Sequence, residues 1–153
     1  MKSTLDICTG LPESQLQVGE DILVENGESS RLYILKSGSV EILKKKLQIN
    51  VVSTPGSVFG EVSLLLQRPH MATVRALEPS LFYVIEDGIK FLQEHPDINL
   101  HIARLLAGRL NSVTNYLVDL QQQFNAREDH LSMVDEVLES LLHHHSEQQD
   151  QEG

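Results

Sequence analysis

The segment FGEVSLLLQRPHMATVRA, from Phe59 to Ala76, decides how this chain is interpreted. Within it, a glycine precedes a short apolar run that begins at Glu61 and is ended by Pro69. A helical turn that directly follows a glycine leaves free backbone N–H groups directed at one point. The positive end of the helix dipole lies behind them, and this arrangement favours an anion. A carboxylate beside such a site fits a ligand that also carries a hydroxyl, so the segment predicts a pocket for a sugar phosphate.

The same residues resemble the phosphate-binding cassette of the cyclic nucleotide-binding domain family. In that family a Phe-Gly-Glu start and a Pro-Arg-x-Ala-Thr-Val finish flank a short helix, and the spacing from Phe59 to Ala76 fits without a gap. Two positions differ. His70 stands where the family usually has the arginine that pairs with the cyclic phosphate, and Met71 stands where it usually has Ala, Ser or Thr. The resemblance extends over roughly residues 18–120.

The resemblance also implies which residues would bind a ligand. Glu61 would accept the ribose 2′-hydroxyl, backbone N–H groups around Gly60 would line the phosphate, and polar residues of a long helix would meet the base. In an alternative interpretation, Glu61 is a surface carboxylate stabilised by the helix dipole, and the polar residues are the solvated face of the helix. The predicted ligand-binding residues are Phe59, Gly60, Glu61, Val62, Ser63, His70, Met71, Ala72, Thr73, Ser112, Thr114 and Asn115.

The residue at position 70 sets the strength of phosphate binding. An arginine would form a bidentate, charge-assisted pair with phosphate, whereas a histidine offers one N–H and is mostly neutral at about pH 7. Losing such a pair costs about 1.5–3 kcal/mol, or roughly ten- to a hundredfold in affinity. Arg68 and Arg75 are the candidates for a replacement charge. We therefore expect that His70→Arg tightens binding, and that affinity rises as the pH falls through the histidine pKa.

Composition limits the class of protein. A chain of 153 residues is one domain, or one domain with an appendage, and its 41% of hydrophobic residues can form a core. The formal net charge of −10 opposes binding to nucleic acid and to anionic membranes. The lone Cys8 excludes an internal disulfide and fits a reducing compartment. Since there is no secretory signal and no apolar run of about 20 residues, we expect a cytoplasmic protein.

Short runs rich in β-branched and aromatic residues alternate with glycine-containing turns through the first half of the chain. Lys44-Lys45-Lys46 is the predicted tip of a hairpin within this region. The pattern favours a mainly β fold with helices, a jelly-roll-like β-roll, and the resemblance implies the same. We predict that 1–96 forms a β-roll cyclic nucleotide-binding domain with short flanking helices. The predicted strands are 16–18, 21–24, 31–35, 39–43, 47–52, 72–74 and 81–85.

A long helix is predicted after a short one that ends at His95-Pro96, with Asp97 as its expected N-cap. Its apolar residues recur at alternating steps of three and four, which is the a/d seam of a helix with a partner. We predict a homodimer through 97–124, although the seam could instead cover the chain's own β-roll. The seam residues are Ala103, Leu106, Leu110, Val113, Leu117, Leu120 and Phe124.

A second, shorter amphipathic helix with an acidic face follows a predicted break at 125–129. Residues 129–142 are a candidate contact for a protein partner, or complete the dimer. We assign 97–145 to a C-terminal helical dimerisation and regulatory segment and 146–153 to a disordered tail. The three histidines from His143 to His145 fall on different faces of a helix, so no metal site is expected.

Two functions remain open from the sequence. The first is a cyclic-nucleotide sensor, in which cAMP or cGMP binds the β-roll and repositions the C-terminal helices. The second is a module that keeps the fold, binds no nucleotide, and serves in dimerisation or protein docking. An enzyme is not expected, because the chain contains no Gly-x-Ser-x-Gly, no His-Glu-x-x-His and no paired cysteines. For the same reason no cofactor is expected. DNA binding is not expected either, because the residues after the long helix are acidic and carry Arg127 as their one basic side chain other than histidine.

Overall fold

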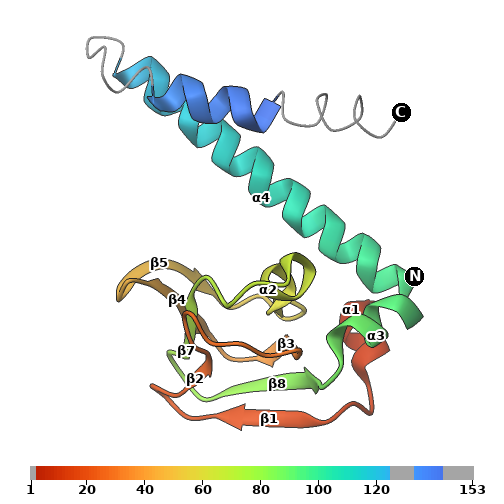
Figure 1. Ribbon diagram of the computed structural model, residues 1–153. Coiled ribbons are helices and arrows are strands. Elements are labelled where there is room, and N and C mark those ends of the chain that lie inside the picture. The colour runs from red at the N-terminus through yellow and green to blue at the C-terminus, as the bar shows by residue number, and fades with distance from the viewer. Residues whose placement is uncertain (1–2, 125–132, 143–153) are drawn as a thin grey trace. The chain divides into compact units, whose positions relative to one another are not determined.

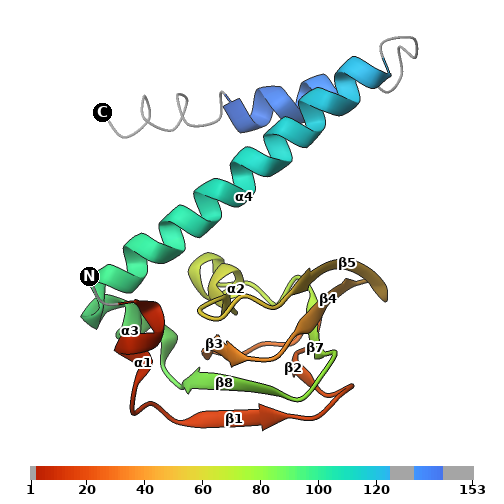
Figure 2. The same ribbon diagram turned by 180° about the vertical axis from the view of Figure 1, so that it is seen from behind.

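The computed structural model describes residues 3–124 and 133–142 of the chain. The chain divides into two compact units, Met1–Ile102 and Ala103–Gly153. Within the described residues the first unit contains eight strands in two antiparallel sheets, together with helices (Figures 1 and 2). The predicted fold class, mainly β with helices and a long C-terminal helix, is therefore confirmed. The elements are α1 (Thr4–Cys8), β1 (Glu13–Leu16), β2 (Asp21–Leu23), β3 (Leu32–Ser37), β4 (Val40–Lys44), β5 (Leu47–Val52), β6 (Val58–Phe59), α2 (Glu61–Leu66), β7 (Thr73–Ala76), β8 (Ser80–Ile85), α3 (Gly88–Glu94) and α4 (Pro96–Gln123).

The core lies between the two sheets, whose strand orders are β1-β8-β3-β6 and β2-β7-β4-β5. Phe82 is its centre, because its ring meets those of Phe59 and Tyr33 edge to face at centroid distances of 5.8 and 6.5 Å. Leu32 and Ile34 are also fully buried, although they point to the opposite face of β3 from the core residues Tyr33 and Leu35. A strand that is covered on both faces is expected to have a continuous apolar sequence, and residues 32–35 of β3 form such a run.

Most strand boundaries differ from the sequence-based prediction by one or more residues, and β6 was not predicted. The differences at the first strand and at the long helix have a clear local cause. The first strand ends at Leu16 instead of running from 16 to 18, because residues 17–20 form a turn in which the Glu20 N–H donates to the Gln17 carbonyl at 3.1 Å. The long helix starts at Pro96, so Asp97 lies in its first turn and is not its N-cap. Proline is favoured at the first helical position, where its missing N–H costs nothing. The hairpin with a lysine tip is confirmed, since β4 and β5 pair on either side of Lys45 and Lys46.

The start of α3 packs tightly against α2. Gly88 donates its N–H to the Ser30 carbonyl at 2.9 Å. A Cβ at this glycine would lie 2.5 Å from Leu64 Cδ2, on α2, and 3.0 Å from the Ser30 oxygen. In both overall views α2 lies between the β4–β5 hairpin and α3 (Figures 1 and 2). A side chain at position 88 would therefore force its neighbours to shift, and α2 and α3 are in direct contact.

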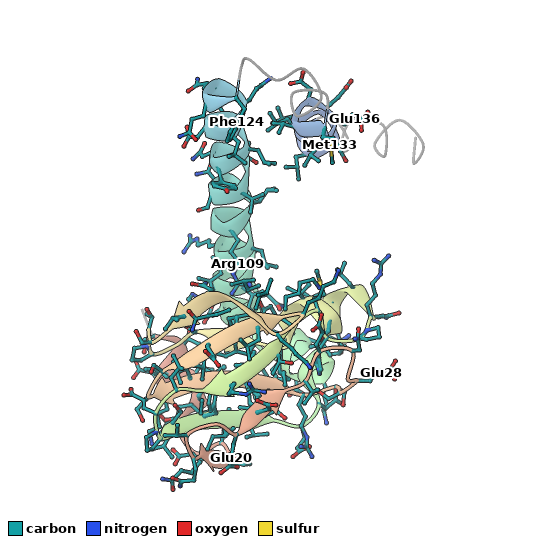
Figure 3. The ribbon with its side chains drawn as sticks, turned by 90° about the vertical axis from the view of Figure 1, so that its left-hand side faces the viewer. Glu20, Glu28, Arg109, Phe124, Met133 and Glu136 are labelled. Carbon is teal, nitrogen blue, oxygen red and sulfur yellow. The ribbon has the colours of Figure 1, made fainter. Side chains whose placement is uncertain are left out.

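The second unit contains the rest of α4 and a helix at 133–142. Figure 3 labels Phe124 at the end of α4, and Met133 and Glu136 on the second helix. Leu138 is buried, and Gln121 Nε2 donates a hydrogen bond to Asp135 Oδ1, so the two helices contact each other within this unit. The predicted break at 125–129, the three histidines and the tail 146–153 lie outside the described residues. In the part of the chain that is described, no helix has both the length and the apolar character that a bilayer crossing requires.

Candidate ligand-binding cassette

The cassette begins where β6 ends, at a glycine in the left-handed region. Gly60 has φ 90° and ψ −4°, and α2 follows at once. A Cβ at this position would also lie 2.8 Å from the Arg31 carbonyl oxygen, so both the backbone conformation and the packing require glycine. No side chain caps the start of α2. The short helix after a glycine, which the sequence predicts, is therefore present with its first N–H groups uncapped by any side chain.

Three polar side chains of the cassette are buried. Glu61, Ser63 and His70 have relative exposures of 5, 7 and 6%. Glu61 is therefore not a surface carboxylate, as the alternative interpretation has it. Its role in ligand binding stays a prediction.

The ring of His70 is held between two serine hydroxyls. Its Nδ1 lies 2.7 Å from Ser63 Oγ and its Nε2 lies 3.3 Å from Ser29 Oγ. The Ser63 hydroxyl also donates to the Gly60 carbonyl at 3.2 Å. With that donation, Nδ1–H donates to Ser63 and Nε2 accepts from the Ser29 hydroxyl, which suits an uncharged ring. Burial lowers the pKa of His70, so the imidazole is neutral at about pH 7.

The backbone of His70 is fixed as firmly as its ring. Its N–H donates to the Gly27 carbonyl at 2.8 Å, and its carbonyl accepts from the Asn26 N–H at 2.8 Å. The loop between β2 and β3 thus binds the end of the cassette through main chain and side chain together. Sequence reasoning missed Ser29 in this role. The sequence around Ser29 is a Gly-Glu turn followed by two serines, and nothing in it indicates a contact with a histidine 41 positions away.

The remaining predicted residues of the cassette have different surroundings. The side chain of Met71 is 55% exposed, and its carbonyl accepts from Lys44 Nζ at 2.8 Å. Thr73 Oγ1 accepts from the Glu25 N–H at 2.9 Å and so helps to hold the end of β2. Three of the predicted residues carry no polar side chain with which to bind a ligand. Phe59 is buried, and Val62 and Ala72 are half-buried.

The two candidate replacement cations are placed differently. Arg75 is paired with Asp21, at 2.8 Å from Nε to Oδ1 and 3.4 Å from Nη2 to Oδ2, so it is committed to β2. Arg68 is exposed and lines a cavity of about 440 Å³ beside α2. The cavity is bounded by the β2–β3 loop at 28–30, by Ser63 and Leu64 of α2, and by Ile89 of α3. Glu28, labelled on that loop in Figure 3, brings a negative charge to the same cavity.

The residues predicted to meet a base lie on α4, in the second unit. Ser112 and Asn115 are exposed, and Thr114 Oγ1 donates to the Leu110 carbonyl at 2.9 Å. That back-bond is the usual one for a threonine inside a helix. Their role in ligand binding stays a prediction.

Comparison with known proteins identifies the family. Residues 13–91 match the model of the cyclic nucleotide-binding domain, which is more than half of the chain. The chain belongs to the cyclic nucleotide-binding domain family, as the cassette predicts.

Individual relatives agree with this assignment. A cAMP-dependent protein kinase regulatory subunit of Yarrowia lipolytica is 35% identical over 80 residues, which cover 52% of this chain and 21% of that protein. The structure of PKAR CBD2 with Sp-2Cl-cAMPS bound is similar, with a TM-score of 0.53 and 25% identity, over 67% of this chain and 71% of that one. A cyclic nucleotide-binding domain from Methylobacillus flagellatus shares the fold, with a TM-score of 0.63 and 20% identity, over 76% of this chain and 71% of that one.

Proposed function

We propose that this chain is a regulatory domain that binds a cyclic nucleotide, cAMP or cGMP, in the cassette 59–76, and that binding repositions the C-terminal helices. The arrangement at the start of α2 carries the proposal. A left-handed Gly60 precedes N–H groups that no side chain caps, and the adjacent Glu61 is buried. Family membership and the cAMP-dependent regulatory subunit among the relatives support a regulatory role over a catalytic one.

The affinity for a cyclic nucleotide is expected to be low. His70 is neutral, and both of its ring nitrogens are bound by Ser63 and Ser29. The phosphate would thus depend on backbone N–H groups without the bidentate pair of an arginine. We expect the dissociation constant to be about ten- to a hundredfold higher than that of a cassette with arginine at this position.

Isothermal titration with cAMP and with cGMP tests this function. Glu61→Ala should weaken nucleotide binding at least tenfold, because the ribose hydroxyl loses its acceptor. Glu86→Ala is a matched control, since its carboxylate pairs with Arg31 at 2.7 Å on the surface. If neither nucleotide binds the wild-type chain, or if both alanine variants bind as the wild type does, the proposed site is wrong.

The same His70 contacts favour a second candidate, a module that binds no nucleotide. A ring whose two nitrogens are bound by protein hydroxyls behaves as a structural residue that fastens α2 to the β2–β3 loop. The chain would then act by dimerisation through 97–124, or by binding a partner through 129–142, of which 133–142 is described. Titration of the His70→Arg variant with both nucleotides separates the two functions. A module that has lost its ligand should show no binding even with an arginine at position 70.

A further inference from the structure

The loop between β2 and β3 contacts both the cassette and α3. Its Asn26 N–H donates to the His70 carbonyl at 2.8 Å, at the end of the cassette. Its Ser30 carbonyl accepts from the Gly88 N–H at 2.9 Å, at the start of α3. A chemical change within residues 28–30 would therefore act on the cassette and on α3 at the same time.

Two neighbouring serines of this loop are exposed, and their hydroxyls have different partners. The Ser30 hydroxyl donates to the Glu86 carbonyl at 3.3 Å. The Ser29 hydroxyl instead lies 3.3 Å from Nε2 of His70. Ser29 thus combines an exposed position on a loop with a side-chain contact to the cassette.

The cavity of about 440 Å³ beside α2 offers space and a positive charge to a group added at Ser29. Ser29 lines it from the loop, and Arg68 lines it from the residues that follow α2. None of the ion pairs between described residues involves Arg68. A phosphoserine carries a charge of about −1.5 to −2 near neutral pH, and a guanidinium can bind its oxygens in a bidentate pair. Glu28, labelled on the same loop in Figure 3, also lines the cavity and would oppose the phosphate.

The imidazole of His70 offers a second partner. In the unmodified chain Nε2 accepts a hydrogen bond from the Ser29 hydroxyl, and Nδ1–H donates to Ser63. A phosphate on Ser29 removes the hydroxyl proton and brings acceptor oxygens to the same place. Nearby negative charge favours the protonated ring, which donates from both nitrogens.

We propose that Ser29 is phosphorylated by a serine protein kinase, and that Arg68 and His70 hold the phosphate in this cavity. In the transfer, Ser29 Oγ attacks the γ-phosphorus of ATP bound to the kinase. The new Oγ–P bond replaces the bond from that phosphorus to ADP, and the hydroxyl proton passes to the catalytic base of the kinase. The modification replaces one neutral hydrogen bond between loop and cassette with two charged contacts. It needs no bound nucleotide, so it goes beyond the proposed function and is tested independently of it.

The test places phosphoserine at position 29 during synthesis of the full chain. Phosphoserine at position 53 is the matched control, because Ser53 is exposed and does not line the cavity. Phosphorus NMR measures the second pKa of each phosphate. We expect this pKa to be at least about half a unit lower at position 29, since nearby cations favour the dianion. Arg68→Gln should remove most of the difference, and Glu28→Gln should enlarge it.

Urea unfolding provides a second measurement on the same proteins. Phosphoserine at position 29 should raise the denaturant midpoint, whereas phosphoserine at position 53 should leave it unchanged. Equal second pKa values at the two positions, or a midpoint that falls at position 29, overturn the proposed phosphate site. A chain that no longer folds with phosphoserine at position 29 overturns it as well.

Mass spectrometry of the protein isolated from the cells that produce it tests whether the modification occurs. Trypsin releases residues 3–31 as one peptide, which contains both Ser29 and Ser30, and fragmentation of this peptide locates the phosphate. A phosphate on Ser29 is the expected result. A phosphate on Ser30 alone, or no phosphate on either serine, overturns the proposal.

Discussion

At the scale of single residues, His70 differs from the arginine that the family usually has at this position. An arginine is always charged and must meet an anion or water, whereas a histidine can be buried neutral between hydroxyls. Ser63 and Ser29 hold the ring in that state. The ring thereby joins α2 to the β2–β3 loop.

Ser63→Ala should destabilise the protein by about 1–3 kcal/mol, because it leaves the buried Nδ1 of His70 without its partner at 2.7 Å. Ser29→Ala is the matched comparison. Its bond is longer, 3.3 Å, and Ser29 is exposed, so water can replace the lost hydroxyl and the cost should be smaller. Urea unfolding followed by circular dichroism gives both values. Equal losses would show that the ring is not held as described.

The pH dependence of stability should report the burial of His70. Its pKa is lowered in the folded state, so below the unfolded value of about 6.5 the unfolded chain takes up a proton that the folded chain refuses. This contribution to stability is complete above that pH and is lost as the pH falls further. His70→Gln should remove it. Unfolding free energies of both proteins at about pH 7.5 and about pH 5.5 give the comparison, and an equal pH response in the two would contradict the assignment.

The same burial changes the expectation for ligand affinity. The sequence alone suggests that cyclic nucleotide binding strengthens as the pH falls through an ordinary histidine pKa. Since desolvation lowers the pKa of His70, any such strengthening is displaced to more acidic conditions, where stability is falling as well.

At the scale of elements, two turns have a backbone in the left-handed region. The turn at Gly60 sets the direction in which α2 starts, and the turn at Lys45 and Lys46 joins β4 to β5. Both have positive φ, of 90°, 51° and 65° at these three residues. The first uses glycine, but the second uses residues for which that conformation is strained.

Gly60→Ala should cost more stability than Gly56→Ala. Both glycines have φ near 90°, so the backbone strain is shared. An added Cβ at 60 would lie 2.8 Å from the Arg31 carbonyl oxygen, whereas at 56 nothing lies within 4 Å. We expect about 1–2 kcal/mol for Gly56→Ala and a further loss for Gly60→Ala, measured by thermal or urea unfolding. Equal losses of stability would mean that the Arg31 carbonyl moves to accommodate the added Cβ at little cost.

Replacing Lys45-Lys46 with Asn-Gly should stabilise the hairpin by roughly 1 kcal/mol, because this pair adopts the left-handed conformation of a two-residue turn with less strain. The β5 register should remain unchanged, since the Lys45 N–H that donates to Glu25 at 3.0 Å is kept. A shift in the denaturant midpoint at constant slope is the expected signature. A lower midpoint would indicate that the lysines make contacts that offset their strain.

At the scale of the whole molecule, α4 is the proposed contact between two copies of the chain. Leu110 and Val113 of its seam are 43 and 50% exposed. Between residues 98 and 124 Asp119 is the one acidic residue, although the chain has a net charge of −10. An acid-free seam on an acidic protein lets two copies approach without like-charge repulsion along their contact.

Val113→Asp should convert dimers into monomers while the unfolding midpoint of the β-roll stays the same. Gln122→Asp adds the same charge at an exposed position away from the seam and should leave the dimer intact. Light scattering coupled to gel filtration, over a range of protein concentrations, distinguishes the two variants. A wild-type chain that is monomeric at all concentrations would remove this proposal.

The features that were predictable from the sequence are local ones. The glycine before α2, the lysine tip of the hairpin and the stop at His95-Pro96 each depend on neighbours a few residues away. Val18 misled the assignment of the first strand because it is apolar, yet it is exposed at the edge of a turn. The pairing of His70 with Ser29, and of Thr73 with the Glu25 N–H, joins residues 41 and 48 positions apart, and no periodicity encodes such contacts.

The joint at Gly88 has a mechanical consequence. The main chain of α3 meets Leu64 of α2 there with no side chain in between. The chain then continues from α3 through His95 into α4. We therefore expect a movement of α2 to be passed to α3 by direct contact.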